Sequence, residues 1–173
     1  MDSSKLIFID ETSINTGMTR LYGRAEGGDR VIDYVPDVRF ERTSVVSSVR
    51  LDGTITPLAF EGSLNGDIFL CYVKQFLVPT LKEGDIVIMD NLSSHKVIGV
   101  ETAIESVGAY VLFLPSYSPD LNPIEQMWSK VKACLRKAKA RTADALFDAL
   151  KIALDAVSLE DIRGWFGEAG YFV

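Results

Sequence analysis

The stretch Asp85–Leu114, with the sequence DIVIMDNLSSHKVIGVETAIESVGAYVLFL, decides the fold class. It begins with a short apolar run that ends in an acid, Asp85–Asp90, and it closes with a second apolar run, Ala109–Leu114, which Pro115 halts. Short, continuous apolar runs are typical of strands that are buried on both faces of a sheet. A helix is expected between the two runs, over Lys96–Val107. This order of strand, helix and strand predicts an α/β fold.

The residues before this stretch extend the predicted sheet. Lys5–Asp10 (KLIFID) is a third apolar run that ends in an acid. Two β-rich segments, Thr43–Arg50 and Thr54–Phe60, are separated by Asp52 and Gly53. Because Asp-Gly between two such segments is a strong hairpin signal, an antiparallel hairpin is expected here.

Helices account for most of the remaining chain. Segments with helical spacing are Asn65–Leu81, Pro123–Ala140, Ala143–Val157 and the short Leu159–Phe166. Met18–Asp29 is rich in glycine and charge and is expected to form a loop or an irregular strand. The whole order predicts a mixed sheet flanked by helices. The ribonuclease-H-like fold has this order, although some other α/β folds share it.

Composition narrows the classes of protein that fit. The 173 residues include 18 Lys and Arg against 24 Asp and Glu, which gives a formal net charge of −6. We expect one domain over residues 1–173. No apolar run approaches the roughly 20 residues of a membrane helix, and Cys71 and Cys134 are too few for a disulfide or zinc framework. A cytoplasmic protein without a membrane partner is therefore expected. The acidic balance argues only weakly against nucleic-acid binding, because it allows a local basic patch.

Three acids stand at the ends of predicted elements. Asp10 and Asp90 each follow a strand, and Glu125 lies at the start of a long helix. Carboxylate oxygens are hard ligands that suit Mg²⁺ or Mn²⁺. Two such ions about 3.5–4 Å apart activate a water or hydroxyl and stabilise the leaving oxygen of a phosphodiester. That chemistry requires several carboxylates from different elements to converge.

Structural interpretations of the same acids remain open at this point. Asp10 and Asp90 are also compatible with ordinary acids at strand ends. Asn122, Pro123 and Glu125 match a helix start in which Asn122 caps the helix and Glu125 completes a capping box.

Three strings surrounding these acids resemble one known family. The strings are FIDET at Phe8–Thr12, IMDNLSSHK at Ile88–Lys96 and LPSYSPDLNPIEQMWSKVK at Leu114–Lys132. They look like the catalytic domain of mariner-type insertion-sequence transposases, which are DDE superfamily endonucleases with a ribonuclease-H-like core. The third string is the most specific of the three.

The resemblance implies a function and a set of partners. Asp10, Asp90 and Glu125 would correspond to the metal-binding triad and hold two Mg²⁺ or Mn²⁺ ions. The expected activity is cleavage of DNA at transposon ends and transfer of the freed 3′-hydroxyl into target DNA. Full-length relatives carry a helix-turn-helix module, which this sequence does not contain, so a separate or fused DNA-binding partner is expected. Such enzymes often work as homodimers, and binding to DNA would place the protein at the nucleoid.

Further residues are candidates for supporting roles. His95 is the only histidine and is expected to orient a phosphate or a carboxylate, or else to be a polar residue at a helix start. Asn91 is expected to hold the strand end by hydrogen bonding. Glu11 should point away from Asp10 because side chains alternate along a strand, so it is left out of the site. Cys71 and Cys134 are expected to be packing residues.

One helix carries the basic residues that suit DNA. Lys130, Lys132 and Arg136 are the candidate DNA contacts, and Lys137, Lys139 and Arg141 continue the basic stretch. A solvated helix face is the alternative. Trp128, Val131 and Leu135 lie at helical spacing on the same segment and are expected to be core.

Two rival functions are kept. The first is another ribonuclease-H-like nuclease, such as a ribonuclease H or a junction resolvase. The second is a catalytically idle transposase remnant that regulates by binding DNA or a partner protein. A haloacid-dehalogenase-like phosphatase is set aside because that class resembles Asp-x-Asp here, whereas Thr12 stands two residues after Asp10.

Overall fold

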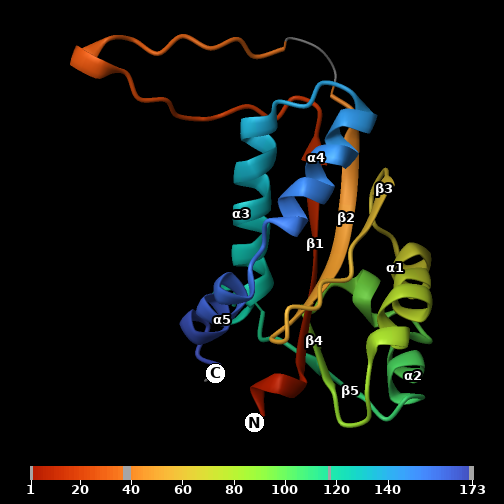
Figure 1. The fold of residues 1–173 in the computed structure, drawn as a ribbon. Coiled ribbons are helices and arrows are strands. Elements are labelled where there is room, and N and C mark those ends of the chain that lie inside the picture. The colour runs from red at the N-terminus through yellow and green to blue at the C-terminus, as the bar shows by residue number, and fades with distance from the viewer. Residues whose placement is uncertain (1, 37–39, 117, 172–173) are drawn as a thin grey trace.

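A five-stranded sheet forms the centre of the computed structural model, which describes residues 2–36, 40–116 and 118–171 (Figure 1). The strand order is β3-β2-β1-β4-β5. β1 pairs antiparallel with β2 and parallel with β4, so the sheet is mixed, as predicted. The strands are β1 Leu6–Asn15, β2 Arg42–Arg50, β3 Leu58–Glu61, β4 Ile86–Met89 and β5 Tyr110–Phe113.

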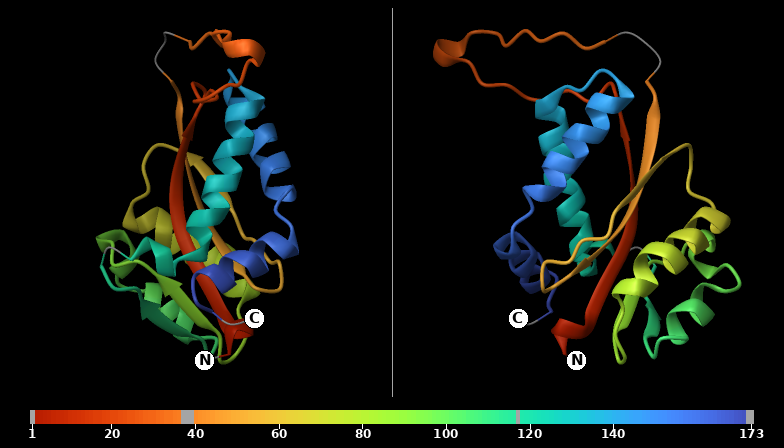
Figure 2. Two further views of the ribbon diagram at one scale, coloured as in Figure 1. Left: turned by 90° about the vertical axis from the view of Figure 1, so that its left-hand side faces the viewer. Right: turned by 45° about the vertical axis from the view of Figure 1, so that its right-hand side comes forward.

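Helices cover both faces of this sheet (Figures 1 and 2). The first pair, α1 (Gly66–Tyr72) and α2 (Val100–Glu105), lies on one face. The other face is covered by α3 (Pro123–Ala138), α4 (Ala143–Asp155) and α5 (Leu159–Glu168). Across the described parts of the chain, no helix is both long enough and apolar enough to span a membrane.

Apolar residues on both faces of β1 explain why the core has two layers. Phe8 and Ile14 pack with the α3 side, and Ile7 and Ile9 pack with the α1 side. A strand that is apolar on both faces can be buried only between two layers of helices. Trp128, Val131 and Leu135 of α3 are buried in the first layer, which confirms their prediction as core.

The length of β1 shapes the functional edge of the sheet. β1 pairs with β2 from Ile7 to Asn15, but β4 pairs only with Leu6–Phe8. The register matches Phe8 with Ile88, so two more residues along each strand bring Asp10 level with Asp90. Asp90 follows the carboxyl end of β4, whereas Asp10 lies inside β1, which continues for five more residues to Asn15, so the prediction that this strand ends at Asp10 is wrong.

Several predicted boundaries are wrong in detail. The second hairpin strand begins at Leu58, and before it only Ile55 forms an isolated bridge, to Val49. The predicted helix over Lys96–Val107 begins at Val100, because Gly99 has a left-handed backbone with φ of 100°. Cys71 is exposed on α1 and is not a packing residue.

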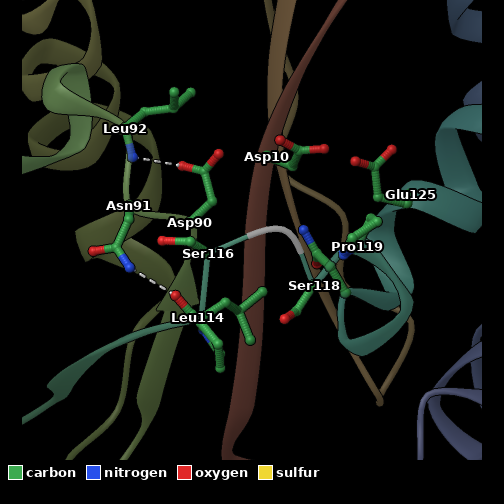
Figure 3. Close-up of a pocket in the computed structure, with 11 residues that line it drawn as sticks. Asp10, Asp90, Asn91, Leu92, Leu114, Ser116, Ser118, Pro119 and Glu125 are labelled. Atoms are coloured by element: carbon green, nitrogen blue, oxygen red, sulfur yellow. Dashed lines mark hydrogen bonds between the residues drawn. The ribbon is translucent and has the colours of Figure 1, made fainter.

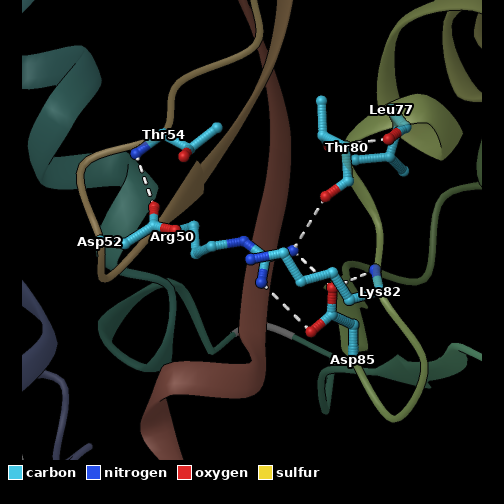
Figure 4. A network of polar contacts seen from close by, with 7 residues as sticks. All are labelled: Arg50, Asp52, Thr54, Leu77, Thr80, Lys82 and Asp85. Atoms are coloured by element: carbon cyan, nitrogen blue, oxygen red, sulfur yellow. Dashed lines mark hydrogen bonds and ion pairs between the residues drawn. The ribbon is translucent and has the colours of Figure 1, made fainter.

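A buried ion pair joins the end of β2 to the segment before β4 (Figure 4). Arg50 donates from Nη1 to Oδ1 of Asp85 at 3.1 Å and from Nη2 to Oδ2 at 2.5 Å. The backbone N–H of Lys82 also donates to Asp85 Oδ2 at 2.7 Å. Both charged residues are buried, so this pair fixes where β4 begins relative to β2.

Residues 20–36 form an extended arm between β1 and β2 that projects away from the sheet (Figures 1 and 2). Most of this arm is irregular, as the loop prediction for Met18–Asp29 requires. Arg141 holds its base by donating to the carbonyl oxygens of Thr16 and Met18 at 3.0 and 3.1 Å. Lys139 pairs with Asp33 of the arm. Two cationic side chains of the basic stretch after Glu125, Lys139 and Arg141, are therefore bonded to the arm and its base.

Candidate active site

Asp10, Asp90 and Glu125 border one cavity of about 400 Å³ (Figure 3). Asp10 comes from β1, Asp90 directly follows β4, and Glu125 lies in the first turn of α3. In Figure 3, Asp10 stands between the other two acids. The rest of the wall is formed by Asn91, Leu92, Leu114, Pro115, Ser116, Ser118, Pro119 and Asn122. Folding therefore brings the three sequence-predicted acids to a common site.

The three acids do not form a closed set of ligands. Over the residues that the structure describes, no group of three His, Cys, Asp or Glu side chains is arranged to hold a metal ion. Asp90 and Glu125 approach the cavity from opposite sides of Asp10 (Figure 3). The three carboxylates therefore surround the open space of the cavity but do not meet at a common point.

Asp10 carries the strongest electrostatic strain in the cavity. Asp10 is only 9% exposed to solvent. Burial raises the pKa of Asp10 to about 8, and the neighbouring charges of Glu125, Glu11 and Asp90 contribute to the increase. A carboxylate that is disfavoured by burial and by other carboxylates is stabilised when a cation binds beside it.

Asp90 is held by a fully buried histidine. His95 Nδ1 lies 2.7 Å from Asp90 Oδ1, and His95 Nε2 lies 3.2 Å from Glu11 Oε2. The imidazole also packs against the ring of Phe69, with 4.3 Å between centroids. Glu11 does point to the face of β1 opposite Asp10, and there it meets His95. His95 therefore lies inside the protein as a bridge between β1 and the end of β4.

The charges on this bridge support one another. Burial alone would lower the pKa of His95, but the hydrogen bonds to Asp90 and Glu11 outweigh it and raise the pKa to about 9. Burial would likewise raise the pKa of Asp90, but hydrogen bonds from His95 and from the backbone of Leu92 hold it below its usual value. Both bonds end on Asp90 Oδ1. The other oxygen, Oδ2, has no hydrogen bond to a described residue.

Glu11 is the member of this bridge that sequence reasoning missed. Strand alternation correctly placed the Glu11 side chain on the face of β1 opposite Asp10. It did not predict that this side chain contacts the buried His95. A signal did exist in the sequence, because a lone histidine near an acid-rich site requires partners when it is buried.

Asn91 ties together the ends of two neighbouring strands. Its Nδ2 donates to the carbonyl oxygen of Leu114 at 2.8 Å, just after β5 (Figure 3). This bond confirms the expected role of Asn91 at the strand end and fixes the chain on both sides of the cavity.

The capping box at the start of α3 does not form. The Asn122 side chain makes no capping hydrogen bond, and the N–H of Glu125 donates instead to the backbone carbonyl of Asn122 at 3.1 Å. The capping interpretation of Glu125 is therefore wrong. Its exposed carboxylate has no capping role and borders the cavity.

The candidate DNA contacts on α3 differ in their surroundings. Lys130 forms an ion pair with Asp161 of α5. Lys132 and Arg136 instead line a second hollow, beside Ser13 and Asn15 at the far end of β1. These two cations share that hollow with the base of the arm, whereas Lys130 is engaged with α5.

These observations define the class of protein as an α/β domain with an acidic cavity beside the middle of β1, at the carboxyl ends of β4 and β5. A family model described as DDE superfamily endonuclease matches residues 5–147. The chain therefore belongs to the DDE superfamily endonucleases.

Curated relatives and solved structures agree with that membership. The chain is 30% identical over 97 residues to the Tc1 transposase of Caenorhabditis elegans, which covers 56% of this chain and 36% of the relative. It is 27% identical over 123 residues to the Tcb2 transposase of Caenorhabditis briggsae, covering 71% and 43% of the two chains. The Mos1 strand transfer complex matches the fold with a TM-score of 0.71 at 19% identity, over 98% of this chain and 52% of that one. The matches thus span about half or less of these longer proteins.

Proposed function

We propose that this chain is the catalytic domain of a transposase that cleaves DNA and joins the freed 3′-hydroxyl to a second DNA duplex. The observation that carries the proposal is the convergence of Asp10, Asp90 and Glu125 on one cavity in a member of the DDE endonucleases. The similarity to the Tc1 and Tcb2 transposases supports DNA as the substrate.

Divalent metal ions fit the donors that the cavity offers. Its three acids supply hard oxygen ligands, and burial together with the neighbouring carboxylates raises the pKa of Asp10, an effect that a bound cation would offset. Mos1 paired end complexes have been solved with Mn and with Mg. Two ions held by Asp10, Asp90 and Glu125 would supply activation of the attacking oxygen and stabilisation of the leaving oxygen.

The surrounding residues would keep these carboxylates in place. His95 contacts Asp90 through Oδ1, which leaves Oδ2 without a hydrogen bond to a described residue. Glu11 fixes the opposite nitrogen of His95, and Asn91 joins the ends of β4 and β5. Side chains that orient ligands in this way commonly tune metal affinity and activity.

DNA binding would rest on a limited set of cations. Lys132 and Arg136 are the favoured contacts because they line an open hollow, and Lys130 could join them only by leaving Asp161. We propose that end recognition requires a fused or separate helix-turn-helix module, and that the working form is a homodimer. The catalytic domain alone should then bind DNA weakly.

A cleavage assay with matched variants tests the proposed function. Asp10→Asn, Asp90→Asn and Glu125→Gln should each abolish Mg²⁺- or Mn²⁺-dependent nicking of a DNA duplex while circular dichroism stays unchanged. Asp148→Asn on the exposed side of α4 is the matched control and should cleave normally. Near-normal cleavage by any of the three variants would remove that acid from the catalytic set.

Two further readouts separate the rival functions. Joining of a 3′-hydroxyl DNA end to a second duplex distinguishes a transposase from another ribonuclease-H-like nuclease. Calorimetry that detects no Mg²⁺ or Mn²⁺ binding would favour a catalytically idle remnant.

A further inference from the structure

The hollow at the far end of β1 is lined by unpaired cations. Its volume is about 410 Å³, and three basic side chains line it, those of Arg20, Lys132 and Arg136. None of the three forms an ion pair or a hydrogen bond with a residue that the structure describes. Lys132 and Arg136 are half-buried, and the described residues that line the hollow include no acid. The hollow is therefore a concentrated site of positive charge.

Three unpaired cations in one hollow are not expected in a chain where acids outnumber bases by 24 to 18. Other cations of the same stretch do have acidic partners, because Lys130 pairs with Asp161 and Lys139 pairs with Asp33. Like charges that share a hollow repel one another and oppose the compact state. A bound anion would offset this repulsion, so the arrangement indicates an anion-binding site.

Apolar side chains form another part of the wall, and they belong to Met18, Leu21, Val35 and Phe40. Phe40 lies against the backbone of Gly17, where a Cβ would be 2.3 Å from the aromatic ring. Glycine thus allows the segments on either side of the arm to close, which keeps Arg20 beside the cations of α3. Apolar walls next to charges of one sign focus the electric field on the space between them.

The hollow lies along the same two elements as the acidic cavity. Both β1 and α3 run from the cavity towards the arm (Figures 1 and 2). Asn15 comes five residues after Asp10, which is roughly 17 Å along a strand. Lys132 and Arg136 come seven and eleven residues after Glu125, which is roughly 10 to 17 Å along a helix. A DNA strand has one phosphate per ~3.4 Å of its axis, so this span corresponds to about three to five nucleotides.

We propose that this hollow is a second phosphate site for DNA, which holds a backbone phosphate about three to five nucleotides from the phosphate that is cleaved. This inference rests on the proposed function. It goes further by including Arg20 of the arm in the site and by fixing where along the DNA the contact falls. The guanidinium groups of Arg20 and Arg136 suit two phosphate oxygens at once, and Lys132 adds a point charge.

An acidic surface of a second copy of the chain is the other anion to consider, because the net charge of each copy is −6. DNA is favoured because the hollow and the acidic cavity lie along the same pair of elements, so that one duplex reaches both.

A map of nicking positions tests the site. The probe is an end-labelled DNA duplex in which one phosphate is replaced by a neutral methylphosphonate, and nicking by the whole chain in Mn²⁺ is read on a sequencing gel. For the wild type, nicking should fall by about tenfold at a position about three to five nucleotides from the replacement, because the hollow then lacks its anion. Arg20→Ala should make this local decrease about threefold smaller, and Arg20→Ala combined with Arg136→Ala should abolish it.

Arg24→Ala is the matched control, because Arg24 lies exposed on the same arm but does not line the hollow. It should show the full local decrease of the wild type. A uniform nicking pattern in the wild type, or an equal local decrease in the wild type and the double variant, would overturn the inference and leave the proposed function standing.

Binding and sedimentation measurements separate the remaining outcomes. Arg20→Ala should lower the slope of log affinity for the unmodified duplex against log salt by about 1, with an unchanged oligomeric state. Loss of self-association in the double variant with an unchanged salt slope would assign the hollow to a second copy and overturn the inference. Wild-type protein that binds DNA with this dependence on Arg20 but does not nick it would overturn the proposed function alone. Wild-type protein that does not bind DNA would overturn both.

Discussion

Asp10 is placed where a carboxylate is least stable in this fold. Burial raises its pKa to about 8, and repulsion from Glu125, Glu11 and Asp90 adds to the increase. In the unfolded chain the same group ionises near its ordinary value of 3.8. Asp10 therefore destabilises the metal-free fold increasingly as pH rises from the ordinary pKa to the raised one. Such a cost is typical of functional residues, which are kept for activity rather than for stability.

Neutralising this residue should stabilise the protein without metal. In EDTA, Asp10→Asn should raise the melting temperature by several degrees at pH 8, and the gain should shrink towards pH 4. Added Mn²⁺ should stabilise the wild type more than the variant. Thermal denaturation across pH measures both effects. A lower melting temperature for Asp10→Asn, or a difference that does not change with pH, would show that burial and repulsion do not disfavour the Asp10 carboxylate.

Glu11 should influence metal binding without touching the metal. Glu11→Gln removes one of the two carboxylates that hold His95, so Asp90 becomes less firmly oriented. We expect Mn²⁺ affinity and cleavage to fall by about tenfold with little loss of stability. Glu61→Gln at the exposed end of β3 is the control. Unchanged metal affinity in Glu11→Gln would show that the contact between Glu11 and His95 does not influence metal binding.

At the scale of elements, the edge of the sheet depends on how β4 is anchored. The buried pair of Arg50 and Asp85 fixes the start of β4, and the register of β4 against β1 then sets Asp90 beside Asp10 (Figure 4). A contact just before β4 thus contributes to the geometry of the acid that directly follows β4.

Breaking this pair from one side should be costly. Arg50→Ala leaves Asp85 buried without its cation and should lower the free energy of unfolding by about 3 kcal/mol. Arg163→Ala, at an exposed position of α5, should change it little. Urea denaturation provides the comparison. A loss no larger than that of the control would mean that Asp85 is satisfied by its backbone donor from Lys82.

Elements with strong patterns were predictable, and elements set by single residues were not. The apolar runs of β1, β4 and β5 and the spacing of α3 predicted the sheet and the main helix. The start of α2 depends on the backbone of Gly99, which no periodicity reveals. At the site, the three acids were predictable from strand ends and resemblance. The failure of Asn122 to cap and the Glu11–His95 contact depend on tertiary packing, which local sequence does not encode.

At the scale of the whole molecule, few basic side chains near the cavity are free of ion pairs or hydrogen bonds to described residues. The net charge is −6, and α3 with the residues after it carries most of the local basic charge near the cavity. The arm and α5 occupy Lys139, Arg141 and Lys130, which leaves Lys132 and Arg136 lining an open hollow. Electrostatic attraction to DNA should therefore be local and weak.

Salt dependence of DNA binding tests this distribution. Affinity should fall steeply with salt, and Lys132→Ala and Arg136→Ala should each reduce the slope of log affinity against log salt by about 1. Lys151→Ala on α4, at an exposed position on another part of the surface, should leave the slope unchanged. Tight sequence-specific binding at physiological salt by this chain alone would contradict the account.

The central claim is that three carboxylates from distant parts of the chain hold divalent metal in one cavity. A crystal soaked in Mn²⁺ and measured for anomalous scattering tests it most directly. The account predicts manganese peaks within coordinating distance of Asp10, Asp90 and Glu125, with Asp90 still held by His95. Manganese that is absent from the cavity, or bound without one of the three carboxylates, would contradict it.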